Sequence, residues 1–339
     1  MSTHFDAFWA VTTLFVPHST NASALLSYQI PYNSADVDGS ASYLLYAPAT
    51  EQNALSRNDI QTALVKGWQV NVPDYNGPLT SFGEGRFEGF ATLDSIRAAK
   101  NAAKGLSDDA RIAMWGYSGG TIASENAAEL QSTYAPDLNI VGTALGGTVS
   151  NVSSIIPAVV GTRFAGLVPE ITLGLFSQYP AAMDYLRAHL KDSGPYNATG
   201  FLAAQHMNIA EAFVYYNNSD IYSYFTNGAD FYQAPLIQDI LKRETYMGFR
   251  GIPLMPLFMY HAVQDEITNI SNPQALVERY CSVGVDVLFE RNSIGGHLAE
   301  MTNGDARAMA WLERVLGGEQ VGEGCVVRDV ALNVTNSPL

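Results

Sequence analysis

The sequence Arg111–Glu125, R-I-A-M-W-G-Y-S-G-G-T-I-A-S-E, decides the fold prediction for this chain. Ile112–Trp115 is a short apolar run that predicts a buried strand, and a helix-compatible run begins at Thr121. Between them, residues 116–120 form a G-x-S-x-G pattern. A strand, this pattern and a helix in that order make a nucleophile elbow, a turn so tight that its neighbours must be small. Because Gly and Ser also mark ordinary loops, the flanking strand and helix are what favour Ser118 as a nucleophile.

Elements on both sides of the elbow alternate between strands and helices. Strands are expected at Ala10–Val16, Ala24–Ile30, Ser42–Tyr46, Val70–Val72, Ile140–Ala144, Leu254–Val263 and Val285–Glu290. Helices are expected at Arg57–Lys66, Phe87–Ala103, Thr121 to about Gln131, Gln274–Ser282 and Asp305–Leu316. Pro256 favours an edge position for its strand, or a place among that strand's first residues. The alternation predicts the α/β class with a mostly parallel central sheet.

The pattern changes after about Val152. Residues 153–248 are rich in Tyr, Phe, Ala and Pro, with short helical pieces and no clear strand. Because this segment enters between two predicted core strands, we expect a helical cap or lid over the top of the sheet. An ordinary helical subdomain is the alternative. Residues 1–152 and 249–339 would then form the core, with 153–248 as the insertion.

Composition limits the classes of partner. The chain has 339 residues, of which 47% are hydrophobic and 15% charged, enough for a sizeable core in one large domain or two smaller ones. A net charge of −15 argues against nucleic acid, whose phosphates need Lys and Arg. No run of eighteen apolar residues occurs, so no transmembrane segment is expected. The sequence has no phosphate-binding loop or metal-ligand cluster, so neither a cofactor nor a metal is expected.

Two features bear on the cellular compartment. Six N-x-S/T sequons favour the secretory route and a glycoprotein: Asn21, Asn151, Asn197, Asn217, Asn269 and Asn333. Cys281 and Cys325 have no metal-ligand spacing, and are either two separate buried thiols or one disulfide. Met1–Asp6 has no basic region and no cleavage site of a signal peptide. Either the protein does not use the usual signal or this chain lacks the natural start.

A serine hydroxyl needs a base, and the base needs an orienting carboxylate. In α/β-hydrolases the chain order is Ser, acid, His. His297 lies in a predicted Gly-rich loop after the last predicted strand, whereas its main rival, His261, falls inside an apolar strand run. Asp265 follows the strand ending at Val263 and is the expected acid, with the adjacent Glu266 as an alternative.

Acyl transfer also requires hydrogen-bond donors for the developing oxyanion. The main-chain N–H of Gly119, next to the nucleophile, is the usual first donor. The second donor should come from a loop at the end of an early strand, and residues 73–75, P-D-Y, are the best candidate. The alternative for Asp74 is a simple Asx turn in a loop rich in Pro and Gly.

Several separate segments together resemble the fungal secretory lipase family. They are P-D-Y-N-G (73–77), F-E-G-F-A-T-L-D-S-I-R-A-A-K (87–100), W-G-Y-S-G-G (115–120), Y-A-P-D-L-N-I-V-G (134–142), G-G-T (146–148), Y-H-A-V-Q-D-E-I (260–267) and G-H-L (296–298). These segments occur in family order over most of the chain. The resemblance implies an α/β-hydrolase fold with an inserted helical cap, and the hydrolysis of carboxylic esters.

The resemblance also assigns residues. It implies Ser118, Asp265 and His297 as a catalytic triad, Asp74 and Gly119 as the oxyanion hole, and a late disulfide between Cys281 and Cys325. Members of the family normally carry a signal peptide and a further segment before the strand that matches Ala10–Val16. The family therefore favours a secreted, extracellular protein, although no signal peptide is present in this chain.

The leading hypothesis is a serine lipase or esterase that acts on a lipid or small-molecule ester, with a lipid–water interface as a candidate site of action. The runner-up is a narrow esterase or acyltransferase acting on a specialised metabolite, which would use the same three residues. A non-enzymatic binding module built on the hydrolase fold is the third hypothesis. An intact set of serine, acid and histidine disfavours it.

Overall fold

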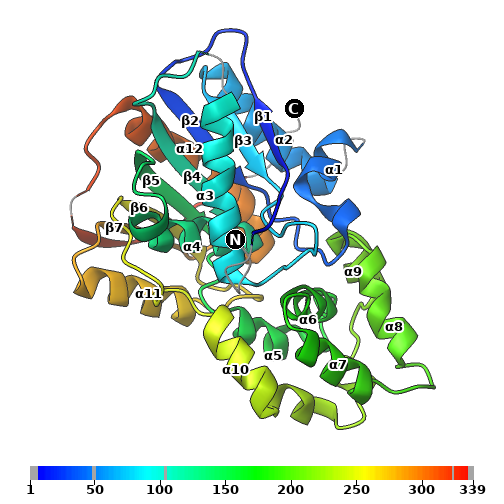
Figure 1. Cartoon of the computed structure of the whole chain (residues 1–339). Helices are drawn as coiled ribbons and strands as arrows, with labels where there is room; N and C mark the ends of the chain where they lie inside the picture. The colour runs from blue at the N-terminus through cyan, green and yellow to red at the C-terminus, as the bar shows by residue number, and fades with distance from the viewer. Residues whose placement is uncertain (1–6, 48–50, 103–104, 323, 335–339) are drawn as a thin grey trace.

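The sheet is the framework of the molecule. A computed structural model describes residues 7–47, 51–102, 105–322 and 324–334, so Met1–Asp6 and Ala103 lie outside the described part. Within it, eight strands form one sheet in the order β1-β3-β2-β4-β5-β6-β7-β8 (Figure 1). The strands are β1 Thr12–Phe15, β2 Ala24–Gln29, β3 Gln69–Pro73, β4 Arg111–Tyr117, β5 Ile140–Gly146, β6 Leu257–Ala262, β7 Val287–Asn292 and β8 Cys325–Val330. Only the β1–β3 pair is antiparallel, which confirms the prediction of a mostly parallel sheet.

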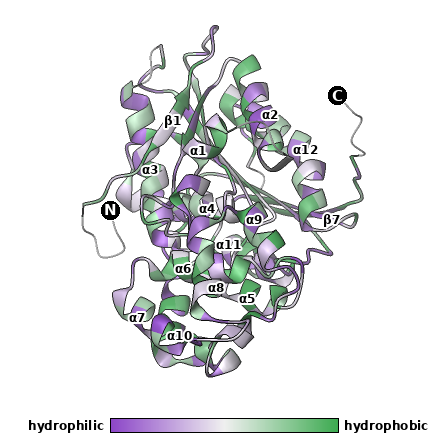
Figure 2. Ribbon diagram, turned by 90° about the vertical axis from the view of Figure 1, so that its right-hand side faces the viewer, coloured by the Kyte–Doolittle hydropathy of each residue, from purple (hydrophilic) through white to green (hydrophobic). Residues whose placement is uncertain are grey.

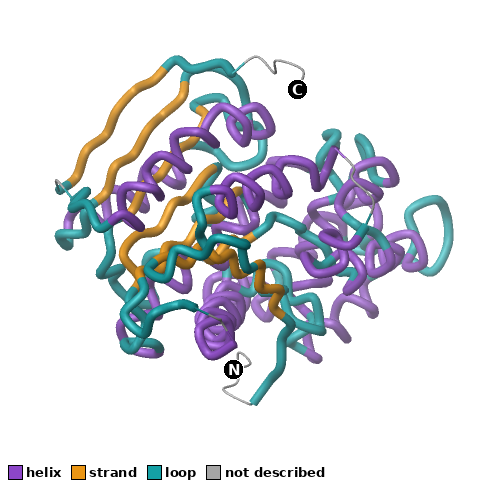
Figure 3. Tube along the Cα trace, turned by 90° about the horizontal axis from the view of Figure 1, so that it is seen from above, coloured by secondary structure: helices purple, strands orange, loops and turns teal. Residues whose placement is uncertain are grey.

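Helices cover both faces of this sheet, as the view from above shows (Figure 3). They are α2 Glu51–Val65, α3 Gly85–Ala102, α4 Gly119–Tyr134, α11 Ser271–Ser282 and α12 His297–Gly317. Side chains alternate along a strand, so one strand serves two layers. In β4, Ile112 and Met114 pack in the cluster that contains residues of α3 and α4. Ala113 and Trp115 pack on the other face, with residues of α2 and α12.

The segment between β5 and β6 is helical. It contains α5 Ile155–Val159, α6 Leu167–Phe176, α7 Pro180–His189, α8 Ala198–Leu202, α9 Ile209–Tyr215 and α10 Pro235–Glu244, joined by short 3-10 turns. In Figures 1 and 2, α5–α8 and α10 gather below the sheet. All ten residues of α6 are buried. Buried residues of this segment belong to one cluster with residues of β5, β6, β7 and α11, so the segment shares a core with the sheet.

One predicted strand is wrong. Residues 42–46 belong to helix α1, Ala41–Tyr46, which follows the 3-10 turn η1, Val37–Gly39. An apolar run this short has the same composition in a buried strand and in a helical turn, so periodicity could not separate them. In the structure, α1 lies against β3 and α2 rather than pairing with a strand.

The strand that follows Pro256, β6, is not at the sheet edge, so the predicted edge position is wrong. This strand pairs with β5 on one side and β7 on the other, so it is central. Pro256 comes immediately before the strand, and its carbonyl accepts a hydrogen bond from the Thr143 N–H at 3.1 Å. Proline has no N–H to contribute to a ladder, but its carbonyl can still pair with the neighbouring strand.

The C-terminal part of the chain also differs from its prediction. Helix α12 begins at His297 rather than at Asp305, so His297 is the first residue of a helix and not part of a loop. The helix passes through Gly304, where a side chain would overlap the ring of Tyr260, so the glycine lets α12 pack closely against β6. Strand β8 was not predicted. It lies beyond β7 at the sheet edge, where its mostly exposed side chains give no clear alternating pattern.

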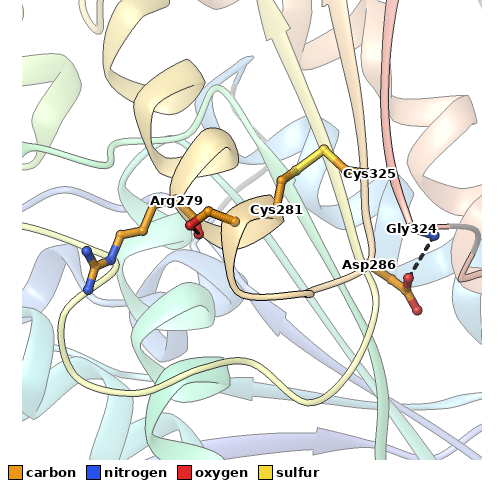
Figure 4. The surroundings of a disulfide bond; sticks show 6 residues. Arg279, Cys281, Asp286, Gly324 and Cys325 are labelled. Atoms are coloured by element: carbon orange, nitrogen blue, oxygen red, sulfur yellow. Dashed lines mark hydrogen bonds between the residues drawn. A yellow bond between two sulfur atoms is a disulfide. The ribbon is translucent and has the colours of Figure 1, made fainter.

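A disulfide joins Cys281 and Cys325 (Figure 4). It connects the end of α11 to the first residue of the edge strand β8. Next to it, the Gly324 N–H donates to Asp286 Oδ1 at 2.8 Å. These two links fix the start of the edge strand β8.

Candidate active site

Ser118 stands at the turn between β4 and α4. Its backbone angles, φ of 50° and ψ of −123°, lie in a region that residues other than glycine rarely adopt. The turn is closed by small neighbours. A side chain at Gly116 would overlap the Gly120 carbonyl, and one at Gly120 would overlap the Gln29 carbonyl of β2. The Ser118 N–H donates to the Gly146 carbonyl at 2.8 Å, which holds the turn against the end of β5.

The structure brings three of the predicted residues together. His297 Nε2 is 2.8 Å from Ser118 Oγ, and His297 Nδ1 is 2.6 Å from Asp265 Oδ2. Ser118 follows β4, Asp265 follows β6, and His297 begins α12 after β7. Since the carboxyl ends of parallel strands meet at one sheet edge, residues far apart in sequence converge there.

The environment of Asp265 keeps its carboxyl ionised. Its Oδ1 accepts the N–H groups of Ile267 and Thr268 at 2.9 and 2.7 Å. Burial raises the pKa of Asp265, but the hydrogen bond and charge of His297 outweigh burial, and the pKa lies below its ordinary value. An ionised Asp265 accepts the Nδ1–H of His297. The Nε2 lone pair is then free to accept the Ser118 hydroxyl proton.

His261 and Glu266, the alternatives for the base and the acid, lie next to Asp265 and His297 but do not take their places. His261 is fully buried in β6, with Nε2 2.9 Å from the Thr268 carbonyl and 3.3 Å from Asp265 Oδ2. Burial lowers the pKa of His261, so its ring is neutral at neutral pH. Glu266 does not contact the ring of His297. Its Oε2 accepts the main-chain N–H of His297 at 2.8 Å.

The two predicted oxyanion residues lie in different surroundings. Gly119 is the first residue of α4, where N–H groups have no partner within the helix. Asp74 follows β3, and its two carboxylate oxygens accept from the N–H and hydroxyl of Ser42 at 2.8 and 2.6 Å. Burial raises the pKa of Asp74. This carboxyl therefore supports the start of α1.

Asn33 is a site residue that the sequence analysis missed. It follows β2, the neighbour of β4, and has a φ of 47°. Its Oδ1 is buried without a hydrogen-bond partner and lies where a side chain of Gly119 would be. The available signal was its place in a turn, P-Y-N-S, directly after a strand beside the elbow strand.

A cavity of about 320 Å³ opens beside these residues and is lined by Ser118, His297 and Asn33. Its walls are mainly apolar. Leu44 and Leu45 come from α1, Leu167 from α6, Ile209 and Phe213 from α9, and Leu298 from α12. A small polar group at the end of an apolar cavity is the usual form of a site for an organic ligand.

Metal-binding clusters and membrane-spanning helices are both absent from the described residues. These residues contain no group of three or more His, Cys, Asp or Glu side chains that could hold a metal ion. None of their helices is long and apolar enough to cross a membrane.

A serine at a strand–helix turn, contacting a histidine that contacts an aspartate, on a mostly parallel sheet, defines the α/β-hydrolase class. The model of the secretory lipase family matches residues 49–324, and the chain belongs to this family. It is 44% identical to the trichothecene C-3 esterase of Fusarium sporotrichioides, over 99% of this chain and 78% of that protein. It is 35% identical to lipase 1 of Candida albicans, over 93% and 70% of the two chains.

Among solved structures, Candida antarctica lipase A in its closed state superposes with a TM-score of 0.87 at 27% identity, covering 97% of this chain and 79% of that one. The family and these relatives show that the protein is a carboxylic-ester hydrolase with the α/β-hydrolase fold. The relatives include both lipases and a trichothecene C-3 esterase.

Proposed function

We propose that the protein cleaves esters through an acyl-enzyme on Ser118, with His297 as the base and Asp265 as its orienting acid. The observation that supports this most directly is the chain of contacts at 2.8 and 2.6 Å through the two ring nitrogens. Ser118 Oγ attacks the ester carbonyl carbon while its proton moves to His297 Nε2. The imidazolium, stabilised by Asp265, returns that proton to the departing alcohol. A water molecule then releases the acid by the same proton route.

The oxyanion proposal uses Gly119 and Asn33. The Gly119 N–H lies one residue after the nucleophile, at the amino end of α4. The buried oxygen of the Asn33 amide lies beside Gly119 and the residue lines the cavity, and we propose that its NH₂ group donates to the oxyanion of a bound ester. Asp74 was the sequence-based second donor. Both of its oxygens contact Ser42, whereas Asn33 lines the cavity, so we propose Asn33 as an alternative second donor to Asp74.

The helical segment 153–248 is proposed as the cap that decides which esters enter. It supplies Leu167, Ile209 and Phe213 to the cavity wall. The lipase hypothesis predicts that this wall accepts fatty acyl chains. The second hypothesis, an esterase for a specialised metabolite, is favoured by identities of 44% and 39% to a trichothecene C-3 esterase and a probable trichothecene esterase.

A lipid–water interface would suit the exposed surface of the helices α1, α9 and α12. Tyr43 and Tyr46 of α1, Val214 and Tyr215 of α9, and Leu298 of α12 are exposed apolar or aromatic side chains. Helices α1, α9 and α12 also line the cavity, so these residues lie on the elements that surround the ester site. An extracellular location is proposed from the secretory family and the disulfide.

One assay series tests the reaction and separates the substrate classes. Wild type and Ser118→Ala are given p-nitrophenyl esters of increasing chain length, an emulsified triglyceride and a trichothecene 3-acetate. We expect Ser118→Ala to lose turnover of every ester, and a phosphonate probe to label Ser118 in peptide mass spectrometry. Labelling of another serine would overturn the mechanism.

Preference for long chains and emulsions supports the lipase. Confinement to the trichothecene acetate supports the narrow esterase, and an ester product with an added alcohol identifies acyl transfer.

A further inference from the structure

We infer that Glu266 is a positioning residue for His297, which it holds through the main chain rather than through the ring. The inference rests on the proposed function, because it assigns a task to a neighbour of the proposed base. Two successive residues would then control one histidine. Asp265 orients the imidazole ring, and Glu266 fixes the point from which that ring projects.

The contact lies at the amino end of a long helix. His297 is the first residue of α12, and its N–H is one of the four that lack a partner inside the helix. Glu266 Oε2 accepts this N–H at 2.8 Å. A negative charge at this end is also favourable because the helix dipole is positive there. The carboxylate therefore fixes the first turn of α12 at the residue that bears the base.

Gly296 makes this approach of the carboxylate feasible. A side chain at Gly296 would overlap Glu266 Oε2 and push the carboxylate away from its present position. The carbonyl of His297 is held as well, because the Tyr117 hydroxyl donates to it at 2.6 Å. Both main-chain polar groups of the proposed base thus have a fixed side-chain partner.

Position matters for a base because proton transfer requires hydrogen-bond distance to the nucleophile. A displacement of about 1 Å at a reacting group can cost about 100-fold in rate. Glu266 is absent from the residues that line the cavity, so its effect on the reaction would pass through His297. Loss of the contact should therefore lower kcat and leave KM nearly unchanged.

Arg163 provides a matched control. Its guanidinium lies 3.2 Å from Glu266 Oε1 and also over the ring of Phe164. The Arg163 side chain is 65% exposed and the Glu266 side chain 36%. Exposed ion pairs of this kind contribute little, about 0–1 kcal/mol. Replacing Arg163 removes the ion pair but leaves the contact between Glu266 and the His297 N–H.

The experiment compares wild type, Glu266→Ala, Glu266→Gln and Arg163→Gln, with kcat expressed per active site titrated by the phosphonate. Glu266→Ala should lose roughly 10- to 100-fold in kcat, with KM within about twofold of wild type. Glu266→Gln should restore most of this loss, because its amide oxygen still accepts the N–H. Arg163→Gln should keep the wild-type kcat.

Titration of active sites removes misfolded protein from the comparison. If Glu266→Ala does not fold, Gly296→Ala tests the same contact, since its methyl group displaces the carboxylate, and it should show the same loss of kcat. Wild-type kcat in either variant, or equal losses in Glu266→Gln and Glu266→Ala, would overturn the inference. Failure of the proposed function differs, because wild type itself would then lack turnover or labelling at Ser118.

Discussion

The conformation of Ser118 is set by its neighbours. A positive φ costs a non-glycine residue about 1–3 kcal/mol. Gly116 and Gly120 permit this conformation because each stands where a side chain would overlap a neighbouring carbonyl. The main-chain hydrogen bond to Gly146 then anchors the turn to β5. The reactive position of the hydroxyl is therefore a property of the whole turn, and substitutions at these glycines should disturb it as much as changes to the serine.

Ser118→Ala and His297→Ala should each lose several powers of ten in kcat, because each removes one partner of the 2.8 Å contact. The double variant should lose little more than either single variant, since residues that act as a unit are not additive. Steady-state hydrolysis of a short p-nitrophenyl ester checks this. Multiplying losses in the double variant would show that the two residues act independently.

Asn33→Ala should lower kcat about 10²- to 10³-fold, the usual effect of removing one oxyanion donor, with a small change in KM. Asp74→Asn is the control, because its amide oxygen can still accept from Ser42. It should stay near wild type. If Asp74→Asn shows the large loss and Asn33→Ala does not, the sequence-based assignment of Asp74 is the better one.

At the scale of elements, the cavity is assembled from helices that are distant in sequence. Helices α1 and α12 belong to the flanks of the sheet, whereas α6 and α9 belong to the helical segment between β5 and β6. Because α6 is buried along its whole length, it is the fixed part of that segment. Helix α9 is partly exposed, with Val214 and Tyr215 at the surface beside the cavity residue Phe213. Substitutions in α9 should therefore affect substrate choice more than the stability of the fold.

Phe213→Ala should shift preference toward bulkier or longer esters, because it removes a ring from the cavity wall. The kcat for the shortest ester should change little, since Phe213 is not in the contact chain of the base. Ratios of kcat/KM across the chain-length series measure the shift. A larger replacement, exchanging residues 153–248 for those of a relative, should transfer the relative's preference. An exchanged protein that folds and keeps its old preference contradicts the cap proposal.

The disulfide ties α11 to β8 across a sequence separation of 44 residues. Replacing both cysteines by serine should lower the unfolding free energy by about 4 kcal/mol in the chain-entropy model. Denaturant unfolding of oxidised wild type, reduced wild type and the double-serine variant measures this. The reduced protein and the variant should agree with each other. Equal midpoints for all three would show that the cross-link does not stabilise the fold.

The whole molecule contains several buried carboxyl groups in addition to its net charge of −15. Burial raises the pKa of Glu88 to about 8, and burial together with the charge of Asp305 raises the pKa of Asp59 to about 9. Burial and the charge of Glu244 also raise the pKa of Glu84. Glu84 precedes α3 and Glu244 ends α10, so that pair joins the sheet layers to the helical segment.

The raised pKa values of these buried carboxyl groups should make the fold less stable as the pH rises. A group whose pKa is higher in the folded state contributes fully below its unfolded pKa and loses its contribution as pH rises through the folded value. For Glu88 this window runs from about 4.5 to about 8. Glu88→Gln should flatten the dependence there by up to about 1.4 kcal/mol per pH unit. Denaturant unfolding between pH 4.5 and 9 measures it. An unchanged slope in Glu88→Gln would contradict the assignment.

The sequence by itself determined the local parts of this protein. The elbow was predictable because its glycines, its apolar strand and its helix are contiguous in the chain, and tight turns restrict residue type locally. The α/β class followed from the alternation of apolar strands and helices, and Asp265 was found because it directly follows a strand. The elbow and Asp265 are signals of a few consecutive residues, and the α/β class is the sum of such local signals along the chain.

Only the tertiary structure decided the rest. Three features depend on contacts with distant elements. Residues 42–46 form a helix that lies against β3 and α2, β8 pairs with β7, and α12 starts at His297, whose N–H donates to Glu266. The place of Asn33 beside Gly119 depends on β2 lying next to β4, although β3 comes between them in sequence. Such neighbours are chosen by the burial of whole sheet faces, and no short stretch of residues records that choice.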